Sequence, residues 1–149
     1  MDRNAKILVI DDDENIRNTM KTILEDEGYV VDLAATGREA IEKTQKTAYN
    51  LALLDIRLPD MEGVELLKLI KDPTPRTRKI MVTGYPSMQN AIIALNKNAD
   101  AYLIKPVNVE KLLTTVKEQL KMQEDERQFS EQKVAEFIET RVKELSTTS

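Results

Sequence analysis

The sequence contains neither cysteine nor histidine, and each absence excludes a kind of chemistry. A chain without cysteine forms no disulfide and no thiolate metal site, which is typical of a reducing compartment, so we expect a cytoplasmic protein. A chain without histidine lacks the commonest general base and the commonest zinc ligand. Any phosphohistidine that takes part in its chemistry must therefore belong to another molecule.

The sequence also lacks a strong charge of one sign and a long hydrophobic run. The formal net charge is −4, so no basic field favours nucleic acid, and we expect no direct nucleic-acid binding. The first apolar run, residues 7–10, is too short for a signal peptide or a membrane span, so we expect no membrane partner. The 149 residues have room for one domain of about 100–150 residues and an extension.

Five short runs rich in isoleucine, valine and leucine recur along the chain, and a stretch with helical spacing follows each of them. The runs cover residues 6–10, 29–34, 50–54, 79–83 and 101–104. Such alternation predicts βα units around a parallel sheet. Runs that are apolar without alternation are typical of strands that helices cover on both faces. The pattern therefore predicts a doubly wound (βα)5 three-layer α/β sandwich with a central five-stranded parallel sheet.

Residues at the expected helix ends support this organisation. The first helical stretch stops before Gly28, the usual residue for a left-handed C-terminal cap. Thr36 with Glu39 three residues later is a capping-box pattern at the start of the next helix. Pro86 and Asn108 stand where two later helices are predicted to begin.

The segment after Pro106 contains neither glycine nor proline, which predicts an extended C-terminal helix over residues 108–146, continuous or broken once. Polar residues interrupt its apolar stripe at Gln123, Arg127 and Ser130. A second stripe follows, formed by Val134, Phe137, Ile138, Val142 and Leu145. We therefore expect a folded domain over residues 1–122 and a helical C-terminal extension or linker over residues 123–149.

The second stripe would be exposed on a monomer, because a helix of this extent reaches farther than a small domain can cover. An exposed apolar stripe usually finds a partner helix. We therefore predict that this part of the helix mediates self-association, as a homodimer, or leads to an output module. A solvated tail is the alternative.

Residues suited to chemistry stand at the predicted strand ends. The first strand ends in Asp11, Asp12 and Asp13, the third in Asp55, the fourth in Thr83 and the fifth in Lys105. Any one of these alone is more often a turn, capping or loop residue. In an open parallel sheet, however, ligands bind beyond the carboxyl ends of the strands. We expect these side chains to meet at one edge of the sheet.

Electrostatics favour one use for this set. Asp11, Asp12 and Asp55 would repel one another unless a cation lies among them. Oxygen ligands without histidine or cysteine select Mg²⁺, with Mn²⁺ possible, over zinc. A carboxylate left free by the metal can attack phosphorus and form an acyl phosphate. We predict Asp55 as this nucleophile, Lys105 as the neutralising cation and Thr83 as a hydroxyl partner.

Four motifs in order, LVIDDDENIR, LLDIRLPDMEG, MVTGYP and AYLIKPV, closely resemble those of the response-regulator receiver domain of two-component phosphorelays. The likeness runs over residues 6–120 and is of the chemotaxis-regulator kind, which implies a flavodoxin-like fold. It implies that Asp55 accepts a phosphoryl group from a sensor histidine kinase or phosphotransfer protein. It also implies that Asp11, Asp12, Asp55 and the backbone carbonyl of Arg57 hold the metal.

The same resemblance implies a conformational switch rather than an enzyme, one that catalyses only its own phosphotransfer and dephosphorylation. Thr83 and Tyr102 are the implied switch residues, and they repack the surface of the fourth helix, fifth strand and fifth helix to control an output partner. A cis peptide is implied between Lys105 and Pro106. Gly84 should leave the site open. One departure is Asn98, in a place where many receivers have glycine.

The residues argue against three other interpretations of the sequence. A phosphatase of the haloacid dehalogenase type needs a second acid two residues after its aspartate, where this chain has Arg57. A dinucleotide-binding domain needs a glycine-rich turn after the first strand, where this chain has three acids. The intact residue set argues against a vestigial interaction module. The sequence leaves open whether the chain is a complete regulator or the receiver of a longer protein, and it identifies neither kinase nor output partner.

Overall fold

The computed structural model describes residues 4–84 and 99–147. A five-stranded parallel sheet lies at its centre in the order β2-β1-β3-β4-β5. The strands are β1 (Lys6–Ile10), β2 (Val30–Ala34), β3 (Leu51–Asp55), β4 (Arg78–Thr83) and β5 (Ala101–Ile104). The described helices are α1 (Glu14–Asp26), α2 (Gly37–Lys46), α3 (Gly63–Leu69) and α5 (Val109–Thr147). The helix predicted to begin at Pro86 and the departure at Asn98 lie outside the described residues.

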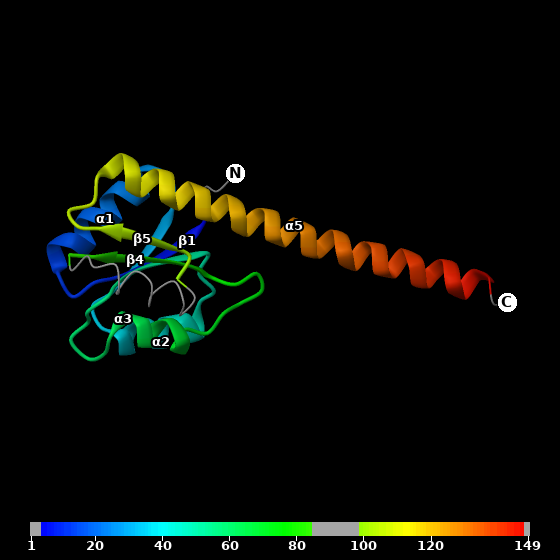
Figure 1. Cartoon of the computed structure of the whole chain (residues 1–149), viewed down its shortest axis with the longest axis horizontal. Helices are drawn as coiled ribbons and strands as arrows, with labels where there is room; N and C mark the ends of the chain where they lie inside the picture. The colour runs from blue at the N-terminus through cyan, green and yellow to red at the C-terminus, as the bar shows by residue number, and fades with distance from the viewer. Residues whose placement is uncertain (1–3, 85–98, 148–149) are drawn as a thin grey trace.

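Helices α1 and α5 cover one face of the sheet, and α2 and α3 cover the other (Figure 1). Strand β1 has β2 on one side and β3 on the other, so the order of the strands reverses at this point. Open α/β sheets bind ligands beyond the strand ends at such a reversal. The predicted flavodoxin-like three-layer sandwich is therefore confirmed. The residues that follow β1 and β3 lie where such a sheet is expected to bind a ligand.

Both faces of the central strands are buried, which explains why their sequences are apolar without alternation. In β1, Ile7 and Val9 pack toward α1 and α5, and Leu8 and Ile10 pack toward α2 and α3. All four are at most 1% exposed. Burial of a large apolar side chain stabilises the fold by roughly 1.5–3 kcal/mol. The two helix layers are therefore held to a common sheet by one hydrophobic core on each of its faces.

The predicted caps form, with one change of detail. Gly28 has a φ of 96°, the left-handed conformation that ends α1. Asn108 accepts a hydrogen bond from the Lys111 amide at 3.1 Å and begins α5. Thr36 accepts from the Glu39 amide at 3.1 Å, but the Glu39 carboxylate accepts from Ala35 instead of Thr36. The capping box at α2 is thus shifted by one residue.

Helix α5 is continuous, so of the two predicted forms the structure has the unbroken one. Gln123, which the sequence marks as an interruption of the apolar stripe, is only 5% exposed. Its amide donates to the carbonyls of Asn50 at 2.9 Å and Arg76 at 2.8 Å, and its carbonyl accepts from the Asn50 side chain. A buried, fully hydrogen-bonded amide is compatible with a core. Gln123 therefore anchors α5 to the amino edge of the sheet.

A charged cluster lies at this same amino edge, around Asp100 immediately before β5. The Asp100 carboxylate accepts from the Arg76 guanidinium at 2.9 and 2.5 Å and from the Lys79 amide at 2.8 Å. The Lys79 ammonium is fully buried and donates to Asp72 at 2.8 Å.

None of the helices in the described part of the chain has the length and apolar character needed to cross a bilayer.

Candidate functional site

The carboxyl edge of the sheet brings together the residues at four strand ends. Asp11 follows β1, Asp55 ends β3, Thr83 ends β4 and Lys105 follows β5. Asp11 is 2% exposed, Asp55 7% and Thr83 0%, although each carries a polar side chain. Polar side chains that are this deeply buried need hydrogen bonds or ions that compensate for the loss of water. The edge therefore forms a polar site surrounded by core.

Lys105 joins the two buried carboxylates. Its Nζ donates to Asp11 Oδ2 at 2.6 Å and to Asp55 Oδ2 at 2.9 Å. Its backbone amide donates to the Thr83 carbonyl at 2.8 Å, and the predicted cis peptide to Pro106 is present. Burial alone would lower the pKa of the Lys105 ammonium, but its hydrogen bonds to the two carboxylates outweigh burial and raise that pKa. Lys105 is therefore a permanent cation of this site.

Three carboxylates form the anionic part of the site. Asp11, Asp12 and Asp55 each offer an oxygen, and these oxygens lie within 4.8 Å of one another. Burial raises the pKa of Asp11, and the hydrogen bonds from Lys105 and the Asp13 amide oppose that shift. Three carboxylates against one ammonium leave two negative charges uncompensated. The donor set and its charge therefore fit a hard divalent cation such as Mg²⁺.

Asp13, the third acid of the run, has a different place. Its Oδ1 accepts from the amides of Asn15 at 2.9 Å and Ile16 at 3.2 Å, so it is the N-cap of α1. Its own amide donates to Asp11 Oδ1 at 2.9 Å and orients that carboxylate. Asp13 thus connects the helix start to the site without joining the group of three carboxylates.

The loop after β3 holds Asp55 in position. The Arg57 amide donates to Asp55 Oδ1 at 3.2 Å, and the Gly63 amide donates to the Ile56 carbonyl at 2.7 Å. A Cβ at Gly63 would lie 2.3 Å from the Asp55 carbonyl oxygen, so only glycine allows α3 to begin this close to β3. The Arg57 amide is therefore placed at the site, and the role of its carbonyl as a metal ligand stays a prediction.

Sequence reasoning missed several residues that position this edge. Gly63 is one, although a glycine at the start of a helix after an acidic loop was a usable signal. Asp60 accepts from the Gly37 and Arg38 amides, both at 2.9 Å, and ties the loop to the start of α2. Arg17 donates to the Asp11 carbonyl at 2.7 Å. No sequence pattern pairs Asp60 or Arg17 with these partners, because the contacts join separate elements.

The two predicted switch residues lie on the same face of the sheet. Thr83 pairs with Ile104, and Tyr102 pairs with Met81, two residues earlier in each strand. Since side chains alternate along a strand, Thr83 and Tyr102 point to the same face. The Tyr102 hydroxyl is buried and has no hydrogen-bond partner among the described residues. Among the described residues, a Cβ at Gly84 would meet only Lys105 side-chain carbons, at 4.0 Å, and the open access expected beside Thr83 stays a prediction.

An aspartate cluster with a lysine, at the carboxyl edge of a five-stranded (βα) sandwich, defines a signal-receiving switch domain. Residues 7–117 match the family model of the response regulator receiver domain. The chain belongs to this family, as its motifs predict. Receiver domains are signalling switches, so the phosphatase and dinucleotide-binding interpretations are set aside.

Known relatives agree with this assignment. The chain is 40% identical over 114 residues to the transcriptional regulatory protein ZraR of Klebsiella oxytoca, covering 76% of this chain and 26% of that protein. It is thus similar to about a quarter of the length of that curated relative. A CheY-like receiver domain protein from Methanospirillum hungatei JF-1 is 50% identical with a TM-score of 0.78, covering 83% of this chain and 98% of that structure.

A further similar structure is the beryllofluoride-activated NtrC4 receiver domain dimer. It is 37% identical with a TM-score of 0.75, covering 80% of this chain and 98% of that one. The likeness therefore extends across the receiver fold.

Proposed function

We propose that this chain takes up a phosphoryl group on Asp55, from a sensor histidine kinase or a phosphotransfer protein, and passes the signal to an output partner. The observation that carries the proposal is the contact of one ammonium, that of Lys105, with the carboxylates of Asp11 and Asp55. This contact supports a site for a phosphoryl group, which is dianionic, because the Asp55 carboxylate that would carry the group and the Lys105 ammonium that would neutralise it already lie together. We propose that the only reactions the chain catalyses are this uptake and the later loss of the phosphoryl group from Asp55.

Each residue then has a chemical task. An Asp55 oxygen attacks phosphorus and forms a new O–P bond, while the P–N bond to the donor imidazole breaks and that nitrogen takes a proton. The Lys105 ammonium lies 2.9 Å from Asp55 and can shift from the carboxylate to a phosphoryl oxygen. Asp11, Asp12 and Asp55, with the Arg57 carbonyl, would hold Mg²⁺, which would neutralise charge on the transferring group.

Signal output would depend on Thr83 and Tyr102. The Thr83 hydroxyl lies at the end of β4, next to the strand that carries Tyr102 and leads to Lys105. A phosphoryl group on Asp55 would attract this hydroxyl, and a change at β4 would alter the packing of Tyr102. The surface of the fourth helix, β5 and α5 would then shift between two packed states. Residues 123–149 would serve as a helical extension toward the output partner.

Removal of the metal should stop phosphorylation. We expect an excess of chelator to reduce labelling by acetyl phosphate to background, and Asp12→Asn to raise the Mg²⁺ concentration for half-maximal labelling at least about tenfold, since one hard anionic ligand is lost. Intact mass spectrometry over a Mg²⁺ titration measures both effects. Asp13→Asn is the matched control, because asparagine caps helices as well as aspartate. Equal labelling in chelator would refute the role of the three carboxylates.

Thr83→Ala should separate phosphorylation from the structural response. We expect labelling of Asp55 to remain substantial, because the hydroxyl contributes no bond to the transfer itself. We also expect the phosphorylation-dependent change in amide exchange over β5 to be lost, because Tyr102 no longer senses the site. Mass spectrometry of labelled and unlabelled protein gives both values. If β5 responds identically in the variant and in the wild type, Thr83 is not the switch.

A further inference from the structure

The end of α5 carries a stripe of exposed apolar side chains beyond the body of the domain. Val134 is 58% exposed, Ile138 55%, Val142 55% and Leu145 66%. We call these four residues the tail stripe. Figure 1 shows the helix projecting well past the sheet, with no described element beside its far half. A row of large apolar groups in water is a typical feature of an interaction surface.

The tail stripe lies on the side of α5 that faces the domain. Val134 and Ile138 follow Val116 and Leu120 by eighteen residues each, which is about five full turns at 3.6 residues per turn. Val116 and Leu120 are 0% and 3% exposed in the core. The polar residues between these two stretches therefore do not change the direction of the apolar side. The tail stripe continues the domain-facing side of the helix into solvent.

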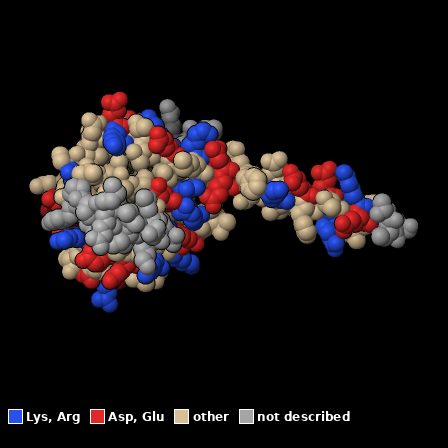
Figure 2. Space-filling model, in the orientation of Figure 1, with Lys and Arg blue, Asp and Glu red and all other residues tan. Residues whose placement is uncertain are grey.

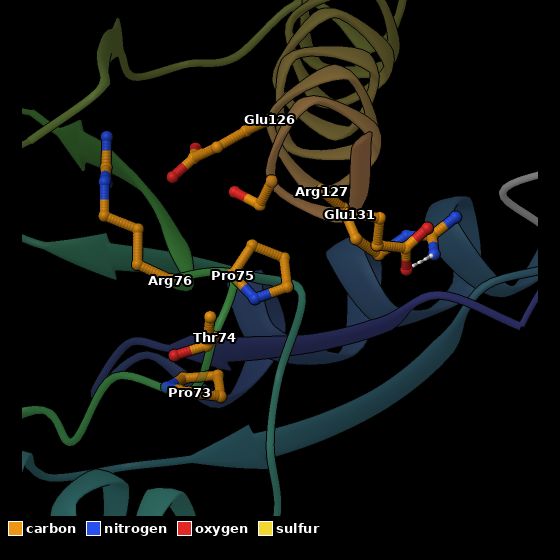
Figure 3. Close-up of a pocket in the computed structure, with 8 residues that line it drawn as sticks. Pro73, Thr74, Pro75, Arg76, Glu126, Arg127 and Glu131 are labelled. Atoms are coloured by element: carbon orange, nitrogen blue, oxygen red, sulfur yellow. Dashed lines mark hydrogen bonds and ion pairs between the residues drawn. The ribbon is translucent and has the colours of Figure 1, made fainter. Parts of the chain in front are cut away.

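A notch joins the domain to this side of the helix. The loop of Pro73, Thr74, Pro75 and Arg76 runs beside residues 126–131 of α5, and the space between them is about 420 Å³ (Figure 3). A shallow groove lined by Ser130, Glu131, Val134, Ala135 and Ile138 begins where the notch ends. Ser130 and Glu131 line both. One continuous path therefore runs from the notch, past the polar side chains of Ser130 and Glu131, along the tail stripe.

We propose that a second copy of this chain occupies this path, with the two α5 helices antiparallel. The tail stripe of each copy packs on that of the other, with Val134 level with Ile138. In this alignment Leu145 of the second copy lies level with Arg127, at the mouth of the notch. The contact is self-complementary, so it closes as a two-fold dimer and leaves no copy of this surface exposed for further association.

The position of the stripe favours the antiparallel direction. In a parallel pair, each tail stripe would face the other helix, and both domain bodies would have to share the space between the helices. In an antiparallel pair, the bodies lie at opposite ends. Charge agrees with this choice, because Glu131 comes level with Arg141 of the other copy, and Arg127 comes within one residue of the level of Glu144. A parallel pair in register would instead place each of these charged residues beside the same residue of the other copy, so that like charges would meet.

Over residues 127–145, which form the proposed contact, four acidic and four basic residues balance, so this segment carries no net charge that would repel a second copy. Figure 2 shows basic and acidic residues side by side along it. The segment from 127 to 145 would contribute about 28 Å of helix from each copy, at 1.5 Å per residue. This surface lies at the opposite end of the sheet from Asp55, and the proposal does not depend on the phosphotransfer.

Sedimentation of the full chain over a range of concentrations tests the association. We expect a monomer–dimer equilibrium, with Ile138→Glu raising the dissociation constant at least about tenfold, because a charge enters the middle of the apolar contact. Thr140→Glu adds the same charge on the opposite side of the same exposed turn and should change the constant by less than about twofold. A chain that stays monomeric at millimolar concentration, or equal effects of the two substitutions, would overturn the proposal.

A distance measurement tests the direction of the helices. The chain contains no cysteine, so Lys121→Cys offers a single site for a spin label, and the Lys121 side chain is 75% exposed. An antiparallel pair centred near residue 136 separates the two labels by about 45 Å along the helix, at 1.5 Å per residue. A parallel pair in register brings them within roughly 20 Å, given a helix spacing of about 10 Å. The short distance would overturn the antiparallel arrangement.

Discussion

Asp55→Asn is expected to abolish uptake of the phosphoryl group. Asparagine has the same shape as aspartate, so the contacts of β3 and the following loop should persist. It lacks the anionic oxygen that attacks phosphorus, so no acyl phosphate can form. The measurement is the intact mass of the protein after treatment with acetyl phosphate and Mg²⁺. The wild-type chain should gain one phosphoryl group that base removes, and the variant should gain none.

Asp60→Asn is the matched control for this experiment. Asp60 lies in the loop after β3 and accepts from the Gly37 and Arg38 amides, but it does not belong to the group of three carboxylates. Its substitution should leave labelling within about twofold of the wild type. Circular dichroism should show both variants folded. If site mapping places the phosphoryl group on a serine or threonine, or if Asp55→Asn is labelled normally, the proposed function is wrong.

Asp100→Ala is expected to lower the free energy of unfolding by about 2–4 kcal/mol. The Asp100 side chain is 9% exposed and accepts from Arg76, Arg78 and the Lys79 amide, so its loss leaves a partly buried cluster of donors without an acceptor. The estimate lies below that for a fully buried pair because the Arg76 side chain is 37% exposed. Urea unfolding with an unchanged slope measures the difference.

Glu126→Ala is the control for Asp100. Glu126 pairs with the same Arg78 at 2.8 Å, but its side chain is 43% exposed. An ion pair this exposed to water contributes at most about 1 kcal/mol. If the two substitutions destabilise the chain equally, Asp100 does not have the central position that the geometry gives it.

The contribution of Asp100 should also depend on pH. Burial alone would raise the pKa of Asp100, but the hydrogen bonds from Arg76 and the Lys79 amide outweigh burial and lower that pKa. A carboxyl with a lowered pKa in the folded state stabilises the fold above its unfolded pKa of about 3.9. This stabilisation is lost as the pH falls through the folded pKa. The difference between wild type and Asp100→Ala should therefore shrink below about pH 4, and a constant difference would contradict this account.

The elements that sequence reasoning found are those whose signals are local. The strands at 6–10 and 101–104 were predicted with their observed bounds, because a short apolar run between polar residues can be read without its neighbours. Gly28 and Asn108 were found as caps for the same reason, since a cap bonds to residues a few positions away. The helix expected at Pro86 lies outside the described residues and stays a prediction.

The sequence by itself determined the parallel sandwich and the residues available at its carboxyl edge, because the positions and ends of the strands follow from hydrophobic runs along the chain, whereas the order of the strands in the sheet came from the structure. Only the tertiary structure decided which partners these residues meet. Lys105 is fifty residues from Asp55, and Gln123 is seventy-three from Asn50, yet each pair is in hydrogen-bond contact. Contacts at such separations depend on how the sheet and the helices pack. The sequence shows that a residue is polar, but it does not show whether packing buries that residue. The direction of the tail stripe was likewise decided by α5 staying one unbroken helix beyond the body that holds it.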